Sequence, residues 1–164
     1  MAMTLVSTVT VGSGGAASIE FTGIPQTGKD LLVVYSARSV SGGFSSRVWL
    51  NGDTTDANYE RRGLRGDGSS VISVSGNFAV FGLITPSTST ANTFGNTAIT
   101  IANYTGSSQK SVSVDSVTER NATESYIEIT AGRWSNTAAV TSLQLTVGGD
   151  TLAQHSTASL YIIS

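Results

Sequence analysis

Short stretches in which apolar and polar residues alternate recur along the whole chain. Near the C-terminus, Leu143, Leu145 and Val147 alternate with Gln144 and Thr146. A period of two places the apolar side chains on one face of a β-strand and the polar side chains on the other. This pattern predicts a strand that is buried on one face.

The same alternation predicts about ten to eleven strands, and no segment shows the apolar spacing of an amphipathic helix. In residues 30–37, apolar side chains fall on both faces, which predicts a central strand covered on both sides, at least at its start. Val117 is out of phase with Val112 and Val114, which predicts a β-bulge near Asp115 or Ser116.

The order of these segments indicates the fold class. Turn residues recur roughly every 8–12 positions, the spacing of an antiparallel sandwich. We therefore expect an all-β, antiparallel two-sheet β-sandwich of the jelly-roll type, with an immunoglobulin-like sandwich as the second choice. The chain has 164 residues and no break in composition, so we expect one domain over residues 1–164.

Charge is sparse in this sequence. Charged residues make up 12% of the chain, against about 25% in an average domain, and the net charge is −2. We therefore expect neither nucleic acid nor an anionic membrane as a partner. The sequence has no cysteine, which excludes disulfides and thiolate metal sites. The N-terminus lacks the pattern of a signal peptide, so we expect synthesis in the cytoplasm without a secretion signal.

Few residues in the sequence offer catalytic chemistry. His155 is the single histidine, it lies in a polar loop, and no Gly-x-Ser-x-Gly motif is present. We expect a surface or structural role for His155 and no enzymatic activity.

Two pairs of carboxylates are candidates for a cation site. Asp53 and Asp56 lie in one turn, and Glu119 and Glu124 flank another polar loop. Carboxylates with backbone carbonyls can hold a hard cation, but Asp is also a common turn residue. The turn interpretation is favoured, and we expect no cofactor and no metal.

Arg61, Arg62 and Arg65 form the main basic cluster. Alternation places Arg61 and Arg65 on the same strand face as Gly63. The cluster is either a solvated face or an interface, because arginine is enriched in protein interfaces. Asp67 completes an Arg-Gly-Asp tripeptide, which a turn also explains. We expect Arg61, Arg62, Arg65 and Asp67 to be the candidate interface residues.

Aromatic residues offer an alternative kind of site. Trp49, Tyr59 and Trp134 could stack on a sugar ring, although aromatic residues of a sandwich more often belong to the core. A carbohydrate site at these residues requires that they be exposed.

Four sequence blocks together resemble a known family. They are Phe21-Thr22-Gly23-Ile24-Pro25-Gln26-Thr27 with Asp30-Leu31-Leu32; Asn58-Tyr59 through Leu64-Arg65-Gly66-Asp67-Gly68-Ser69-Ser70; Asn92-Thr93-Phe94, Ile101-Ala102-Asn103-Tyr104 and Lys110-Ser111; and Ala131-Gly132-Arg133-Trp134-Ser135-Asn136-Thr137-Ala138-Ala139-Val140-Thr141-Ser142-Leu143. In this order the blocks resemble a family of jelly-roll virion proteins of tailed bacteriophages, including cyanophages, and the resemblance spans nearly the whole chain.

The resemblance implies a structural role on the virion. Members resemble modules of capsid surfaces or tail tips, and the family supplies no catalytic residue. Because strand-like sequence begins close to Met1, we expect a capsid decoration or cement protein rather than a fibre. Such proteins generally bind the major capsid protein as homotrimers at local three-fold axes. The alternative is a tail-fibre, receptor-binding or carbohydrate-binding module that contacts a host surface glycan.

Overall fold

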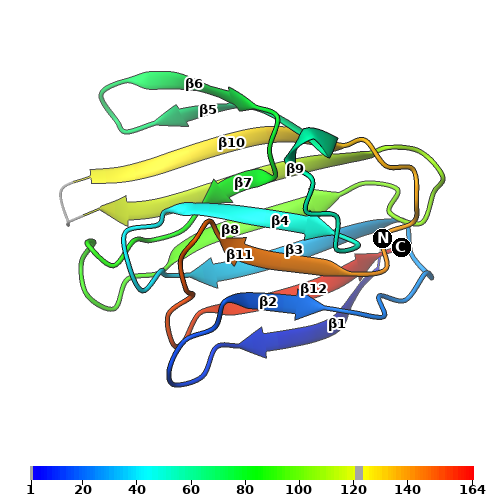
Figure 1. The fold of residues 1–164 in the computed structure, drawn as a ribbon, viewed down its shortest axis with the longest axis horizontal. Helices are drawn as coiled ribbons and strands as arrows, with labels where there is room; N and C mark the ends of the chain where they lie inside the picture. The colour runs from blue at the N-terminus through cyan, green and yellow to red at the C-terminus, as the bar shows by residue number, and fades with distance from the viewer. Residues whose placement is uncertain (1, 121–123) are drawn as a thin grey trace.

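The computed structural model describes residues 2–120 and 124–164 and shows two antiparallel sheets packed face to face (Figure 1). The larger sheet has eight strands in the order β1 (Met3–Thr10), β12 (Thr157–Ile163), β3 (Asp30–Ala37), β8 (Gly95–Ile101), β9 (Lys110–Arg120), β10 (Glu124–Trp134), β5 (Tyr59–Gly66) and β6 (Val71–Gly76). The smaller sheet has four strands in the order β2 (Ser18–Phe21), β11 (Leu143–Val147), β4 (Ser45–Leu50) and β7 (Val80–Leu83). In the described ranges, a 3-10 turn, η1 (Asp56–Asn58), is the helical element, and no helix is long and apolar enough to span a membrane.

The strand order is that of a jelly roll with two added hairpins. The layers β1-β12-β3-β8 and β2-β11-β4-β7 form the eight-stranded jelly-roll body. The β5–β6 hairpin follows β4, the β9–β10 hairpin follows β8, and the two hairpins join through the pairing of β10 with β5. These four strands, called the hairpin extension below, widen the larger sheet beyond the smaller one (Figure 1). The predicted all-β, two-sheet sandwich is confirmed.

The core lies between the two sheets, where apolar side chains from both inner faces meet. The predicted alternation in β11 is confirmed, because Leu143, Leu145 and Val147 are buried whereas Gln144 and Thr146 are partly exposed. Burial of a full aliphatic side chain contributes about 1.5–3 kcal/mol. The packing of two such faces therefore stabilises the jelly-roll body.

The outer face of β3 differs from the prediction. Leu31, Val33 and Tyr35 point into the core and are fully buried, but Val34 on the opposite face is 41% exposed and Leu32 is partly exposed. Because no layer of the described residues covers the outer face of the larger sheet, the expectation of a strand covered on both faces is wrong.

The β-bulge predicted near Asp115 or Ser116 is also wrong. β9 pairs in continuous register with β10 from Lys110 to Arg120 and with β8 from Val112 to Val117. Val117 is out of phase because its side chain points to the outer face, where it is 44% exposed. The apolar side of β9 thus changes from inner to outer within one regular strand.

A glycine on β10 allows the two sheets to approach closely. Gly132 lies on the inner face of β10, and a Cβ atom there would collide with the ring of Phe81 on β7. Phe81 is fully buried and belongs to the main core. The absence of a side chain at Gly132 therefore allows β7 to lie close over β9 and β10.

Candidate binding surface

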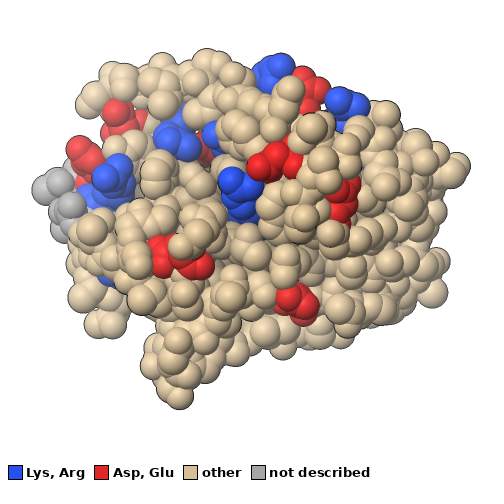
Figure 2. Space-filling model, viewed as in Figure 1, with Lys and Arg blue, Asp and Glu red and all other residues tan. Residues whose placement is uncertain are grey.

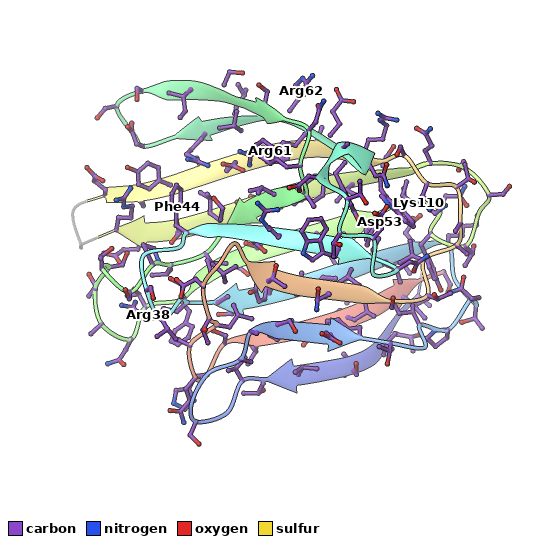
Figure 3. The ribbon with its side chains drawn as sticks, in the orientation of Figure 1. Arg38, Phe44, Asp53, Arg61, Arg62 and Lys110 are labelled. Atoms are coloured by element: carbon purple, nitrogen blue, oxygen red, sulfur yellow. The ribbon has the colours of Figure 1, made fainter. Side chains whose placement is uncertain are left out.

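The arginine cluster divides between the two faces of β5. Arg61 and Arg62 project to opposite sides of the strand (Figure 3). Arg65 lies on the same side as Arg61. Arg65 is directly opposite Glu128 on β10, and its Nε and Nη2 atoms donate to Glu128 Oε2 at 2.8 and 2.5 Å. Arg61 Nη1 donates to Glu128 Oε1 at 3.4 Å. Two cations therefore share one carboxylate.

This ion cluster is enclosed by protein. Glu128 is fully buried and Arg61 is 8% exposed. Arg61 also donates to the carbonyl of Val80 at 3.3 Å, and its guanidinium lies 5.0 Å from the ring centre of Phe78. Burial lowers the pKa of Arg61, and the negative charge of Glu128 opposes that shift.

The burial of Arg61 and Arg65 corrects the predicted interface. Neither side chain is available to a partner surface, because both are used to neutralise Glu128. Arg62 is exposed and forms an ion pair with Glu60 at 2.9 Å. Asp67 is partly exposed in the β5–β6 turn, where backbone amides of the turn lower its pKa. Of the four predicted residues, Arg62 and Asp67 are accessible.

The predicted carbohydrate platform is contradicted in the same way. Trp49 is 7% exposed, Tyr59 1% and Trp134 0%. The rings of Tyr59 and Trp134 stack with centres 6.4 Å apart, and Trp49 meets Tyr59 edge-on at 5.5 Å. These aromatic residues form one end of the core, so no ring face is free for a sugar.

Asp53 holds this aromatic cluster in place. Its Oδ2 atom accepts hydrogen bonds from Trp134 Nε1 at 2.8 Å and Asn58 Nδ2 at 2.9 Å, and Oδ1 accepts from the backbone of Thr55 at 3.1 Å. Burial opposes ionisation of Asp53, but these hydrogen bonds outweigh it and lower the pKa of the carboxyl group. Asp53 lies at the turn that precedes η1 (Figure 3).

The other candidate carboxylates also contact protein donors. Asp56 accepts from Arg47 at 3.1 Å and from the amide of Ala79 at 3.2 Å. Glu119 accepts from the hydroxyls of Thr90 and Thr93 at 2.7 and 3.2 Å. Residues 2–120 and 124–164 contain no group of three or more His, Asp or Glu side chains with the arrangement of a metal site.

Two further cations have structural roles that the sequence pattern did not indicate. The guanidinium of Arg38 donates to the carbonyl oxygens of Ser87, Ser89, Thr90 and Thr93 at 2.9–3.0 Å and thereby organises the loop before β8. Neither sequence spacing nor local motif identifies such a contact, because its partners are about 50 residues away.

Lys110 binds backbone oxygens in a similar way at the opposite end of the sheet (Figure 3). Its Nζ donates to the carbonyls of Gly106, Ser108 and Thr137 at 2.7, 2.5 and 3.4 Å. Lys110 is fully buried, and burial lowers the pKa of its ammonium group. One of the two lysines of the chain is thus an internal hydrogen-bond donor.

His155 occupies a tight turn. It is exposed, its φ is 73°, and its backbone amide donates to the carbonyl of Val11 at 2.9 Å. The left-handed conformation suits a turn residue before β12.

The charged residues are unevenly distributed over the surface. Figure 2 shows charged side chains gathered over the half of the molecule that holds β4, β7 and the hairpin extension, with few near β1 and β2. This view shows the face that carries the smaller sheet.

The outer face of the larger sheet instead carries most of the exposed apolar side chains. Among the described residues, ten large apolar side chains are exposed, and eight of them lie on this face: Met3, Leu5, Val34, Leu64, Val71, Val117, Ile127 and Ile129. Monomeric proteins rarely expose large contiguous apolar patches without a binding role. This outer apolar face is the candidate binding surface.

The chain was compared with protein-family models, curated proteins and solved structures. No protein-family model, no curated protein and no solved structure matches the chain.

Proposed function

We propose that the chain is a structural protein of a tailed-bacteriophage virion. In this role it binds the outer capsid surface at capsomer junctions, as a homotrimeric decoration or cement protein, and its partner is the major capsid protein. The resemblance of four sequence blocks to phage virion proteins supports this proposal, as does the jelly-roll architecture that the resemblance implied. The role is structural and not catalytic.

The single observation that carries the proposal is the outer apolar face of the larger sheet. Eight exposed apolar side chains lie on a face with no overlying layer among the described residues. In contrast, Arg38, Arg61, Arg65 and Lys110 donate to internal acceptors. The surface therefore favours contacts with other protein subunits over contacts with a charged ligand.

The mechanism is stabilisation by linkage. A protein that binds an assembled shell, but not its separated subunits, stabilises the assembled state by RT ln(1 + [L]/Kd). At a ligand concentration about 100 times the Kd, this contribution is about 2.7 kcal/mol per site. Such a function requires complementary surfaces and no reactive group.

The test is cosedimentation of the purified protein with shells assembled from the capsid protein of the same genome. We expect saturable binding near one trimer per local three-fold axis and a raised melting temperature of the shell. Unassembled capsid protein is the matched control, and it should bind weakly.

The opposite result identifies the alternative function. If the protein fails to bind shells but adsorbs to host cells or to their surface polysaccharide, the decoration role is overturned in favour of a receptor-binding module. The burial of Trp49, Tyr59 and Trp134 means that such a module would use other residues.

A further inference from the structure

The edges of the smaller sheet are protected against pairing with another chain. These edges are β2 and β7, and each strand has four residues. β2 carries the charged residue Glu20. On β7, the carbonyl oxygens of Val80 and Leu83 accept hydrogen bonds from side chains of the larger sheet. Short length, charge and internal hydrogen bonds each make a strand edge a poor template for a further strand.

The two edges of the larger sheet are β1 and β6, and they differ in regularity. β1 contains a β-bulge between Leu5 and Ser7, which interrupts the ladder along that edge. β6 pairs with β5 in continuous register from Val71 to Gly76, and its six residues include neither a charged residue nor a proline. Among the strands that the structure describes, β6 is therefore the unprotected edge, and it lies at the rim of the sheet far from β1 (Figure 1).

The β5–β6 turn shows which backbone groups of β6 point away from β5. The amide of Asp67 donates to the carbonyl of Ser70 at 3.2 Å, so these two residues form a hydrogen-bonded pair. Hydrogen-bonded and non-hydrogen-bonded pairs alternate along an antiparallel ladder. The N–H and C=O groups of Val71, Ser73 and Ser75 therefore point outward, and no described residue hydrogen-bonds to them. These backbone groups are free to pair with another strand.

The side chains along this edge define the chemistry of the partner. Val71 is 70% exposed on the outer face, and Ile72 is 50% exposed on the inner face. Outward N–H and C=O groups at strand spacing are matched by the backbone of an extended polypeptide. Because β6 carries no charge, the complementary strand is uncharged as well.

We propose that β6 pairs antiparallel with β6 of a second copy of this chain, about a two-fold axis at Ser73. In this register, Ser73 is opposite Ser73 of the second copy, and Val71 is opposite Ser75 of the second copy. All outward-pointing backbone groups then form hydrogen bonds. An axis at Ile72 or Val74 has the same alternation but leaves Ser75 or Val71 without an opposed residue in β6.

Two features of β6 favour a second copy over a strand of another protein. β6 is already extended and hydrogen-bonded on one side, so pairing of two copies requires no ordering of a flexible segment. The proposed register also places Ile72 of each copy beside Val74 of the other, which covers an apolar side chain that is half exposed in the single copy. No like charges meet across the contact, because β6 has none.

This inference does not rest on the proposed function, because the pairing needs no capsid protein. The contact joins the two larger sheets into one continuous sheet. A two-fold contact links copies in pairs and does not itself form the trimer of a decoration protein. On a capsid shell, the same contact would link neighbouring trimers.

Sedimentation velocity at several protein concentrations measures the pairing. We expect wild-type protein to form a dimer in a concentration-dependent way. S73P removes the outward amide at the axis from both copies, so the dissociation constant of the dimer should rise at least about tenfold. Proline is tolerated on an edge strand whose N–H faces solvent, so the variant should fold. S73T keeps the amide, is the matched control and should dimerise like wild type.

A charge-pairing experiment tests the register and the identity of the partner. S73K and S73E each place like charges opposite one another at the axis, so each variant alone should dimerise at least about tenfold more weakly. An equimolar mixture of the two should form a heterodimer, because opposite charges then meet. This recovery requires residue 73 of one copy to face residue 73 of the other. Fluorescence of the buried Trp49 and Trp134 checks that the variants fold.

Three results would overturn the inference. The first is a wild-type protein that is monomeric at its highest soluble concentration. The second is an oligomer that S73P and S73K leave unchanged. The third is a mixture of S73K and S73E that associates no better than either variant alone.

The outcomes also separate this inference from the proposed function. A monomer that binds and stabilises capsid shells overturns the β6 pairing and leaves the decoration role intact. A dimer that depends on Ser73 but ignores shells supports the pairing and overturns the decoration role.

Discussion

The jelly-roll body and the hairpin extension share one continuous sheet, yet their inner and outer faces have opposite polarity. In the body, inner residues such as Val33 and Leu160 are apolar and fully buried. In the extension, the inner face of β10 carries Glu128 and Thr130, which are buried, while Ile129 between them faces outward. The same backbone geometry therefore supports two different ways of filling the space beneath a sheet.

The difference follows from what lies opposite each region. The smaller sheet covers the body with a second apolar layer, whereas only its edge strand β7 and the loop residues Phe44 and Phe78 lie over the inner side of the extension. Arg65 and Arg61 fill the space there, with their guanidinium groups 5.1 and 5.0 Å from those two ring centres. A cluster of ions under aromatic rings replaces the aliphatic core.

The largest loss of stability is expected from removal of the carboxylate that Arg61 and Arg65 share. E128Q leaves Arg61 and Arg65 buried without a counter-charge, and loss of one member of a buried ion cluster costs about 3–5 kcal/mol. We expect a loss of this size in the free energy of unfolding, measured by urea denaturation. E60Q, in an exposed ion-pair network, is the control and should cost less than about 1 kcal/mol. Equal effects of E128Q and E60Q would contradict a buried cluster.

A truncation in the core of the jelly-roll body gives a free-energy change to compare with that of E128Q in the extension. Leu160 is fully buried on β12, and L160A should cost about 2–5 kcal/mol through lost burial and the cavity that remains. Thermal and urea unfolding measure this change. V40A, at a position that is 53% exposed, serves as the control and should change the free energy of unfolding by less than about 0.5 kcal/mol.

Asp53 offers a smaller, pH-dependent test at the junction of the two regions. Its pKa is lowered in the folded state, so its stabilisation is present above the pKa of the unfolded chain and is lost as the pH falls through the folded pKa. D53N should cost about 1–3 kcal/mol at pH 7, because hydrogen bonds to a charged group are lost. The difference from wild type should shrink as the pH falls below about 4.

The measurement is urea denaturation at several pH values, followed by tryptophan fluorescence, since Trp134 donates directly to Asp53. T54S, at the exposed neighbouring position, controls for changes in the turn itself. A stability difference between D53N and wild type that stays constant from pH 7 to pH 3 would count against an ionised Asp53 in this role.

The smallest expected effect is at the outer end of the extension. Arg133 pairs with Glu60 at 3.3 Å, and its side chain is 46% exposed. R133Q should therefore change the free energy of unfolding by about 0–1 kcal/mol, and less at high salt. R61Q, which alters a buried arginine of the same extension, should cost several times more. Similar losses in the two variants would remove the distinction between the two faces.

Local sequence predicted much of the fold. The alternation of Leu143, Leu145 and Val147 identified β11 and its buried face, and the succession of such segments identified a two-sheet sandwich. At β5, alternation correctly placed Arg61 and Arg65 on one face. These features depend on the period of a strand, which is a property of neighbouring residues.

The roles of the candidate site residues could not be predicted, because they depend on contacts between distant parts of the chain. The sequence does not show whether an aromatic residue is exposed, so Trp49, Tyr59 and Trp134 were candidates for a sugar-stacking site. In the structure all three are core residues. Arg61 and Arg65 resembled an interface because Glu128, their partner, lies more than 60 residues away.

In the sequence, Ile127, Ile129 and Ala131 alternate with Glu128 and Thr130, and this period of two by itself determined a strand with one apolar and one polar face. Only the tertiary structure decided that Ile127 and Ile129 point outward and that Glu128 points inward. A period of two shows that the faces differ, but the burial of a face depends on which layer packs against it. Here the pairing of two distant hairpins and the limited width of the smaller sheet determined which face of β10 is buried.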